Sequence, residues 1–205
     1  MPVTLDPDAA AVLQAFRDAG RPPYETLTPP EARELYLKGC DAARPETPEL
    51  KSVTPLDATG PHGEIPMRVY RPKTLRETNG RAPCLVFYHG GGWVIGDLDS
   101  HDAVCRILAH EGQLLVIAVD YRLSPEHKFP TAVNDAIAAL QWIAANADSL
   151  GIDPARLMVG GDSAGGNLSA VVALNAREHG PTIAAQVLIY PATDFRMSHP
   201  SHSEP

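Results

Sequence analysis

The sequence predicts an α/β protein in which helices cover both faces of a mostly parallel central sheet. Four apolar runs without polar alternation indicate strands that are buried on both faces. Helix-like stretches separate these runs, and such alternation is typical of parallel sheets with right-handed crossovers. The predicted strands are Cys84–Tyr88, Leu114–Val119, Leu157–Val159 and Ala185–Ile189. A length of 205 residues suits one domain of this class or part of a larger one.

The clearest predicted helix covers residues 131–150. Its apolar residues recur at spacings of four, three and four, which places them on one face of a helix. Gly151 follows directly, and glycine is the residue that most often ends a helix. The predicted buried face consists of Val133, Ile137, Leu140 and Ala144.

Residues 1–48 are predicted to form a helical segment that is an accessory layer rather than part of the core. Its first helix begins at the N-cap Asp6 and ends at Gly20; its second begins near Thr28 and ends at Gly39. The first helix has an apolar face made of Val12, Leu13 and Phe16.

Residues 49–205 are predicted to form the core. This part begins with two short strand candidates, Val53–Ala58 and Ile65–Tyr70, on either side of a turn-prone segment rich in glycine and proline. The chain then continues into the four apolar runs.

Composition argues against several classes of function. A net charge of -8 gives no basic face for a nucleic acid, and no apolar run approaches the ~18 residues of a membrane span. The three cysteines, Cys40, Cys84 and Cys105, are too scattered for a disulfide framework or a zinc site, and with the absence of a signal segment they favour the cytoplasm. No nucleotide-binding or zinc-hydrolase motif occurs, so the sequence does not support a nucleotide cofactor or a catalytic zinc ion.

The strongest chemical signal is the motif Gly161-x-Ser163-x-Gly165, which lies between an apolar strand and a helical segment. This is the context of a nucleophile elbow, a sharp turn that lifts a serine hydroxyl above the sheet. The turn crowds the neighbouring backbone, so side chains two positions before and after the serine would clash. The helix that follows would direct its N-terminal amides toward a developing negative charge.

A second motif, His89-Gly90-Gly91-Gly92-Trp93, follows directly after another predicted strand. Its three glycines leave backbone N–H groups unobstructed, as the binding of an oxyanion requires. Both motifs lie at carboxyl ends of strands, which is the edge where open α/β sheets bind ligands.

With these motifs the chain resembles the hormone-sensitive-lipase-like carboxylesterases, or bacterial family IV esterases, of the α/β-hydrolase superfamily. The resemblance spans nearly the whole chain, including the N-terminal helices, which form part of a cap over the active site in this family. The matching residues are His89–Trp93, Gly96 and Asp97, Asp120–Leu123, Pro125–His127, Phe129 and Pro130, Gly161–Asn167, and Tyr190 and Pro191.

The resemblance implies an α/β-hydrolase fold and a cofactor-free hydrolysis of short- to medium-chain acyl esters, the small-molecule substrates expected here. It implies that Ser163 is the nucleophile and that His89 supports the glycine loop rather than acting as a base. The oxyanion hole would be formed by the amides of Gly91, Gly92 and Ala164. Trp93 is a weaker candidate for the substrate pocket, since a tryptophan there is as readily part of the core.

The chain departs from the family pattern after Ser163. In α/β-hydrolases the catalytic acid and the histidine follow the serine in that order. In the family that this chain resembles, they lie on loops after two further strands. Those last strands are missing, so we expect neither triad partner in this chain. Asp194 with His199 or His202 has the right order, but no strand separates these residues and the family places no triad member there.

Two other functions remain open. A non-catalytic protein could retain the pocket and bind a small molecule, as hormone receptors of this superfamily do, and a peptidase could share the elbow but would bring a further large domain.

Asp162, Glu126 and His127 have structural interpretations, with Asp162 holding the elbow through hydrogen bonds. The sequence leaves the oligomeric state undecided.

Overall fold

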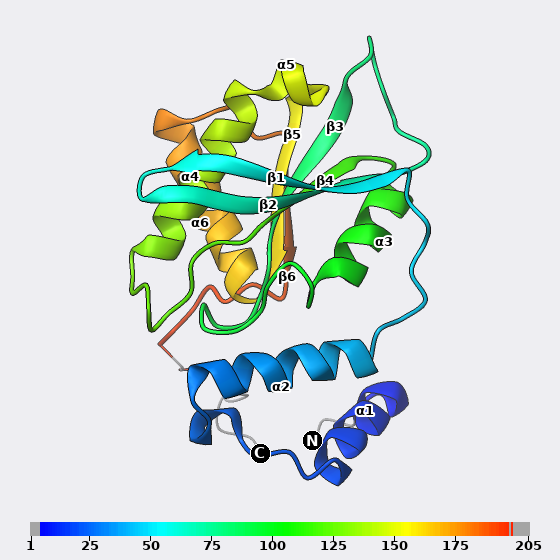
Figure 1. The fold of residues 1–205 in the computed structure, drawn as a ribbon, viewed down its shortest axis with the longest axis vertical. Helices are drawn as coiled ribbons and strands as arrows, with labels where there is room; N and C mark the ends of the chain where they lie inside the picture. The colour runs from blue at the N-terminus through cyan, green and yellow to red at the C-terminus, as the bar shows by residue number, and fades with distance from the viewer. Residues whose placement is uncertain (1–4, 197, 199–205) are drawn as a thin grey trace.

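A six-stranded sheet forms the centre of the molecule in the computed structural model, which describes residues 5–196 and 198, with Phe16 described by its backbone only (Figure 1). The strand order is β1-β2-β4-β3-β5-β6. β3 is parallel to β4 and β5, and β5 is parallel to β6, while β1 and β2 are antiparallel additions. The strands are β1 (Ser52–Gly60), β2 (Gly63–Arg71), β3 (Ala82–Tyr88), β4 (Leu115–Val119), β5 (Ile152–Asp162) and β6 (Ala185–Ile189).

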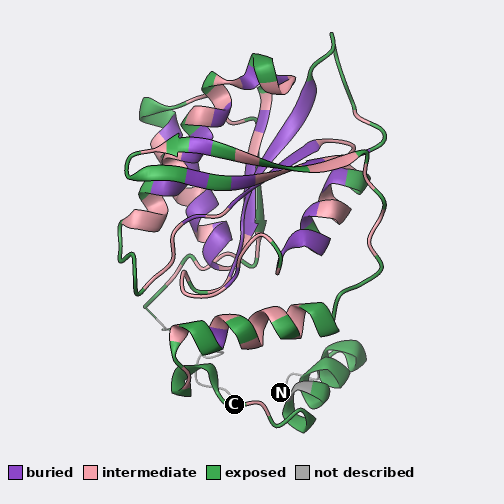
Figure 2. Ribbon diagram, viewed as in Figure 1, coloured by how far each residue is buried: buried purple, intermediate pink, exposed green. Residues whose placement is uncertain are grey.

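Helices cover both faces of this sheet, as predicted. The helices are α1 (Pro7–Asp18), η1 (Tyr24–Thr26), α2 (Pro29–Ala42), α3 (Asp102–Gly112), α4 (Thr131–Ala145), α5 (Ala147–Leu150) and α6 (Ala164–His179). Alternate residues of β3 take part in two separate cores: Val86 packs in the cluster that includes α4 and α6, and Phe87 in the cluster that includes α3. The buried residues in Figure 2 accordingly run along the central strands. Neither face of such a strand meets solvent, so both sets of alternating side chains are apolar, which explains the unbroken apolar run.

The two N-terminal helices lie beyond one end of the sheet and are separate from its faces (Figure 1). α1 begins as predicted, with the Asp6 carboxylate accepting a hydrogen bond of 2.9 Å from the N–H of Asp8. In the predicted apolar face of α1, the two residues whose side chains are described, Val12 and Leu13, are exposed. The predicted stop of the second helix at Gly39 was wrong, since α2 continues to Ala42.

The predicted buried face of residues 131–150 needs a correction. Of the four residues predicted, only Leu140 is buried; Val133, Ile137 and Ala144 are half-buried at the margin of the core. The centre of the face carries alanines and an aspartate instead, because small side chains let a helix lie close to the sheet and to its neighbour α6. The buried residues of α4 are Asp135, Ala136, Ala139, Leu140 and Ile143. The helix also ends at Ala145, before the short α5.

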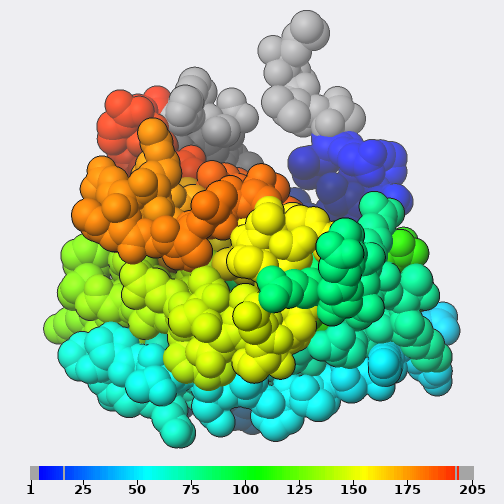
Figure 3. All heavy atoms as spheres, turned by 90° about the horizontal axis from the view of Figure 1, so that it is seen from above, coloured from blue at the N-terminus to red at the C-terminus, as the bar shows by residue number. Residues whose placement is uncertain are grey.

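The prediction that Ala185–Ile189 is buried on both faces was wrong as well. β6 is the edge strand of the described sheet, pairs with β5 alone, and leaves Val187 and Leu188 exposed. In the view from above, the orange part of the chain that leads into β6 lies at the surface (Figure 3). An apolar run marks a strand that tolerates burial, but only a neighbouring element can bury it.

Candidate active site

The elbow at Ser163 has a strained backbone and is crowded on both sides of the serine. Ser163 joins β5 to α6 with φ 51° and ψ -113°, a backbone conformation that L-residues rarely adopt. A Cβ added at Gly161 or at Gly165 would collide with the carbonyl oxygen of Tyr88 on the adjacent strand. The predicted clash of side chains two positions before and after the serine is therefore confirmed, and it explains why both positions are glycine.

The backbone of Ser163 is held from the side of β6. Its N–H donates to the carbonyl of Ile189 at 2.9 Å, and its carbonyl accepts from the N–H of Ala192 at 3.1 Å. The side-chain amide of Asn167 donates to the carbonyl of Ala192 at 2.8 Å. Ala164, the first residue of α6, is buried, and its N–H is one of the amides that a helix leaves without an intrahelical partner. The elbow thus presents a hydroxyl and a helix N-terminus at the same place.

The glycine loop leaves the sheet beside this elbow. Tyr88 at the end of β3 pairs with Gly161 of β5, so the segments that follow the two strands start from adjacent points. Gly91 and Gly92 adopt φ values of 117° and 59°, which glycine tolerates and other residues resist. Within the described part of the chain, the N–H groups of these two glycines donate no hydrogen bond. The loop therefore carries two free donors next to the serine-bearing turn.

Asp162 connects the elbow to the glycine loop. Its Oδ1 accepts hydrogen bonds from the N–H of Gly90 at 2.9 Å and from Nε2 of His101, a buried residue, at 3.2 Å. Burial of the carboxyl would raise its pKa, but the bonds from His101 and Gly90 outweigh it and lower the pKa below its ordinary value. The predicted hydrogen-bonding role of Asp162 is confirmed.

His89 lies beneath the loop as a neutral side chain. Its Nδ1 donates to the carbonyl of Gly90 at 2.8 Å, and its ring stacks on Tyr121 with centroids 4.3 Å apart. The hydroxyl of Tyr121 donates to the carbonyl of His89 at 2.6 Å. Burial lowers the pKa of His89 to about 4. These contacts agree with a supporting role.

Trp93 follows the glycines in a left-handed conformation, with φ 61°. Its half-buried ring lies 5.9 Å from the ring of Phe195, centroid to centroid, at an interplanar angle of 48°. Trp93 also packs against the core beneath it. The structure therefore places it at the junction between the core and the segment after β6.

The tempting pair of Asp194 with a later histidine cannot be assembled from the described residues. The Asp194 carboxylate accepts hydrogen bonds from Nε and Nη2 of Arg196 at 2.9 and 2.7 Å. His199 and His202 lie outside the residues that the structure describes. The remaining histidine after Ser163 is His179, which is exposed at the end of α6 beside Glu178.

The sequence profile of the family described as alpha/beta hydrolase fold matches residues 85–205, which is more than half of the chain. The chain belongs to the α/β-hydrolase family. The ester-hydrolase names of the curated relatives agree with the predicted resemblance of this α/β-hydrolase to the hormone-sensitive-lipase-like group.

The curated relatives include LipN and NlhH of Mycobacterium tuberculosis. This α/β-hydrolase is 46% identical to the carboxylic ester hydrolase LipN over 198 residues, covering 94% of this chain and 52% of the relative. It is 40% identical to the carboxylesterase NlhH over 204 residues, covering 99% and 63%. Among solved structures, an ester-hydrolase from the metagenome of Lake Arreo matches with a TM-score of 0.87 and 43% identity, covering 97% of this chain and 64% of that one. The chain thus spans between about half and two thirds of the length of these proteins.

Two residues of this α/β-hydrolase touch the site without having been predicted. His101 binds Asp162, and Arg33 of the N-terminal segment donates to the carbonyl of Val94 in the glycine loop at 2.8 Å. Neither stands in a motif that points to its partner, because both partners are distant in sequence. For Arg33 the available signal was slight: it is the one arginine of the predicted second helix.

Two further searches of the described residues gave negative findings for this α/β-hydrolase. No group of three or more histidine, cysteine, aspartate or glutamate side chains there could hold a metal ion. Likewise, none of the helices in the described ranges combines the length and apolarity needed to cross a bilayer.

Proposed function

We propose that this protein is a serine carboxylesterase that hydrolyses short- to medium-chain acyl esters through an acyl-enzyme on Ser163. The observation that carries the proposal is the strained Ser163 turn beside a loop with two free amide donors. A hydroxyl held in this way can attack an ester carbonyl, and donors aimed at the developing oxyanion lower the barrier. The esterase names of the relatives support the same reaction.

In this proposal the oxyanion is bound by the N–H groups of Gly91, Gly92 and Ala164. The first two come from the glycine loop, and the third comes from the positive end of the α6 dipole. Trp93 would contact the substrate beside them, where its ring meets Phe195. Residues 1–48 would act as a cap, since α2 lies across the end of the sheet at which both motifs emerge (Figure 1).

The triad acid and histidine are proposed to be lacking in this 205-residue chain. Among the described side chains none donates to or accepts from the Ser163 hydroxyl, and His89 is enclosed by the core. Without a base, serine is a weak nucleophile, although an oxyanion hole and binding alone leave catalysis of roughly 10³- to 10⁴-fold over water. We therefore expect slow turnover by this chain.

Steady-state hydrolysis of p-nitrophenyl acetate tests the proposal, with Ser163→Ala as the matched control. We expect weak turnover by this chain that Ser163→Ala changes little, because that residual rate comes from the oxyanion hole and binding. A version extended with the two further strands, the acid and the histidine should be faster, and Ser163→Ala should remove that gain. Equal rates for the short and the extended protein would overturn the proposal that the 205-residue chain lacks the triad acid and histidine. Equal rates for the extended protein with and without the Ser163→Ala substitution would overturn the esterase itself.

The non-catalytic alternative keeps the same pocket for a small molecule. It gains support if the extended protein binds an ester analogue but does not turn it over.

The proposed cytoplasmic location rests on the cysteines, of which Cys84 and Cys105 are buried thiols and Cys40 is a half-buried one.

A further inference from the structure

Arg33 of α2 connects the N-terminal helix to two loops of the core. Its Nε donates to the carbonyl of Val94 at 2.8 Å, and its Nη2 donates to the carbonyl of Ser124 at 3.0 Å. The outer edge of the same guanidinium makes a bidentate pair with Glu126, at 2.9 and 2.7 Å. This pairing lowers the pKa of Glu126 to about 2. One side chain therefore makes four hydrogen bonds to three residues that lie far from it in sequence.

The bond to Val94 completes the anchoring of the turn that carries the proposed oxyanion donors. The carbonyl of Gly91 accepts from the N–H groups of Val94 and Ile95, at 3.1 and 3.0 Å. The carbonyl of Trp93 accepts from the N–H of Ser124 at 2.8 Å. With Arg33 on Val94, three carbonyls of this turn are engaged. In a trans peptide the C=O of one residue and the N–H of the next point in opposite directions. The Val94 carbonyl therefore orients the N–H of Ile95, which donates to the Gly91 carbonyl, and that carbonyl shares its peptide with the N–H of Gly92. Holding Val94 in this way helps to fix where the Gly92 amide points.

Only an arginine suits this position. The planar fork presents its N–H groups in fixed directions, so Nε and Nη2 can reach two backbone carbonyls while Nη1 and Nη2 hold a carboxylate. The Arg33 and Glu126 side chains are 30% and 47% exposed, so the ion pair itself adds little stability. The effect of Arg33 is therefore expected in the geometry of the turn rather than in global stability.

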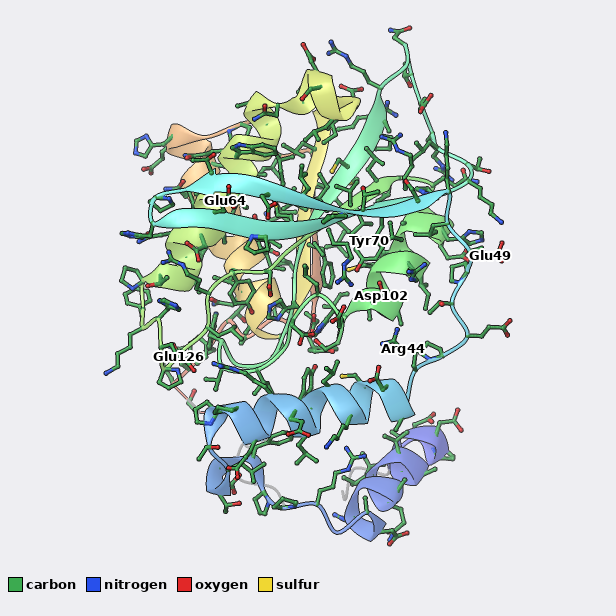
Figure 4. All side chains as sticks on the ribbon, viewed as in Figure 1. Arg44, Glu49, Glu64, Tyr70, Asp102 and Glu126 are labelled. Atoms are coloured by element: carbon green, nitrogen blue, oxygen red, sulfur yellow. The ribbon has the colours of Figure 1, made fainter. Side chains whose placement is uncertain are left out.

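A second arginine holds the other end of the same helix and offers a comparison. Arg44, just after α2, pairs with Asp102 of α3 at 3.5 Å and with Asp41 at 2.6 Å. Figure 4 shows Glu126 and Arg44 at opposite ends of α2. The third acceptor of Arg44 is the carbonyl of Asp99, which lies outside the glycine loop. Both arginines fasten the helix to the core, but Arg33 alone of the two binds the turn.

We propose that Arg33 is a positioning residue for the oxyanion hole, through which the N-terminal helix sets the direction of the Gly92 amide. The inference rests on the proposed esterase function, and it adds Arg33, a residue of the N-terminal segment, to the residues that serve the reaction. The consequence is that loosening α2 at Arg33 weakens transition-state binding while the substrate still binds.

The test compares Arg33→Met, Arg33→Lys and the control Arg44→Met in the full chain. Steady-state hydrolysis of p-nitrophenyl acetate separates kcat from KM, and hydrogen exchange measured by mass spectrometry follows the peptide that spans residues 90–96. For Arg33→Met we expect a roughly tenfold or greater fall in kcat with little change in KM, and faster exchange in that peptide. Arg33→Lys should recover part of the kcat and part of the slow exchange, and Arg44→Met should change neither kcat nor the exchange of that peptide.

The exchange measurement keeps the inference testable even if the proposed function fails. If the unaltered chain shows no turnover, faster exchange at 90–96 in Arg33→Met but not in Arg44→Met still supports the positioning role. Unchanged exchange and unchanged kcat in Arg33→Met overturn it. The same loss in Arg33→Met and Arg44→Met also overturns it, because general fastening of the helix would then suffice.

Discussion

Asp162 and Gly90 are joined by a hydrogen bond of 2.9 Å from the Gly90 N–H to the Asp162 carboxylate. Asp162 is the last residue of β5, directly before Ser163, and Gly90 lies in the loop that follows β3, so this bond ties the serine turn to the glycine loop. A Cβ at Gly90 would collide with the same carboxylate, so glycine is needed for the approach. The relative position of Ser163 and the proposed oxyanion donors thus depends on one acceptor, whose side chain is 13% exposed.

Replacing Asp162 with alanine should destabilise the fold and misplace the loop. The N–H of Gly90 and the ring of His101 would lose their common acceptor, and an unpaired buried donor costs about 1–3 kcal/mol. Asp162→Asn retains one carbonyl oxygen and should lose less. Urea unfolding at pH 7 measures both variants, and equal stability of Asp162→Ala and the unaltered chain would contradict the assignment.

The same carboxylate gives a pH dependence whose sign is set by its lowered pKa. A group with a depressed pKa in the folded state contributes stability above its unfolded pKa of 3.8, and that stability is lost as the pH falls through the folded value. The unaltered chain should therefore lose more stability below pH 3.8 than Asp162→Asn does. Parallel losses in the two proteins would show that other groups control acid unfolding.

His89 should remain neutral throughout the range in which an ordinary histidine titrates. Its pKa falls from 6.5 to about 4 because burial disfavours the charged ring. The contribution of His89 to stability is then present above pH 6.5 and lost as the pH falls toward 4. Two-dimensional NMR of the His89 ring should show no titration between pH 5 and pH 7. A midpoint near 6.5 would reveal an open, hydrated loop.

Gly165→Ala should be far more damaging than an ordinary glycine substitution. The new methyl group would meet the carbonyl of Tyr88, which is backbone within a sheet and cannot move aside. Gly20→Ala is the matched control: Gly20 has φ 57° and open space around it, so only backbone strain of about 1 kcal/mol applies. Thermal unfolding should show a much larger loss for Gly165→Ala, and similar losses would mean that the elbow can relax.

Asp135→Ala tests a charge that is fully enclosed by the core. The Asp135 carboxylate is completely buried and accepts from the N–H, Nε and Nη2 of Arg122 at 3.1, 2.8 and 2.7 Å. Breaking such a pair costs about 3–5 kcal/mol when the charge left behind is buried; Arg122 is 28% exposed, so we expect the lower end. Urea unfolding measures the loss, with Asp153→Ala, which removes a partly exposed pair with Arg156, as the control. A loss no larger than that of the control would contradict this account.

Predictions from the sequence succeeded where the physical requirement is local. The strained serine needs glycine two residues before and after it, and the structure confirms both positions. The turn-prone segment between the first two strand candidates does join them, as the antiparallel pair β1 and β2. Predictions of burial were weaker: Val133 and Ile137 have the right periodicity but lie at the margin, because burial depends on which element covers a face.

The Ser163 turn and the glycine loop could be recognised from the order of residues alone, because each depends on the backbone freedom of a few consecutive positions. The links between them could not. Arg33 meets Val94, and His101 meets Asp162, only after α2 and α3 pack beside the loops. A hydrogen bond requires its two atoms to lie about 3 Å apart, and for residues this distant in sequence that proximity exists only in the folded chain.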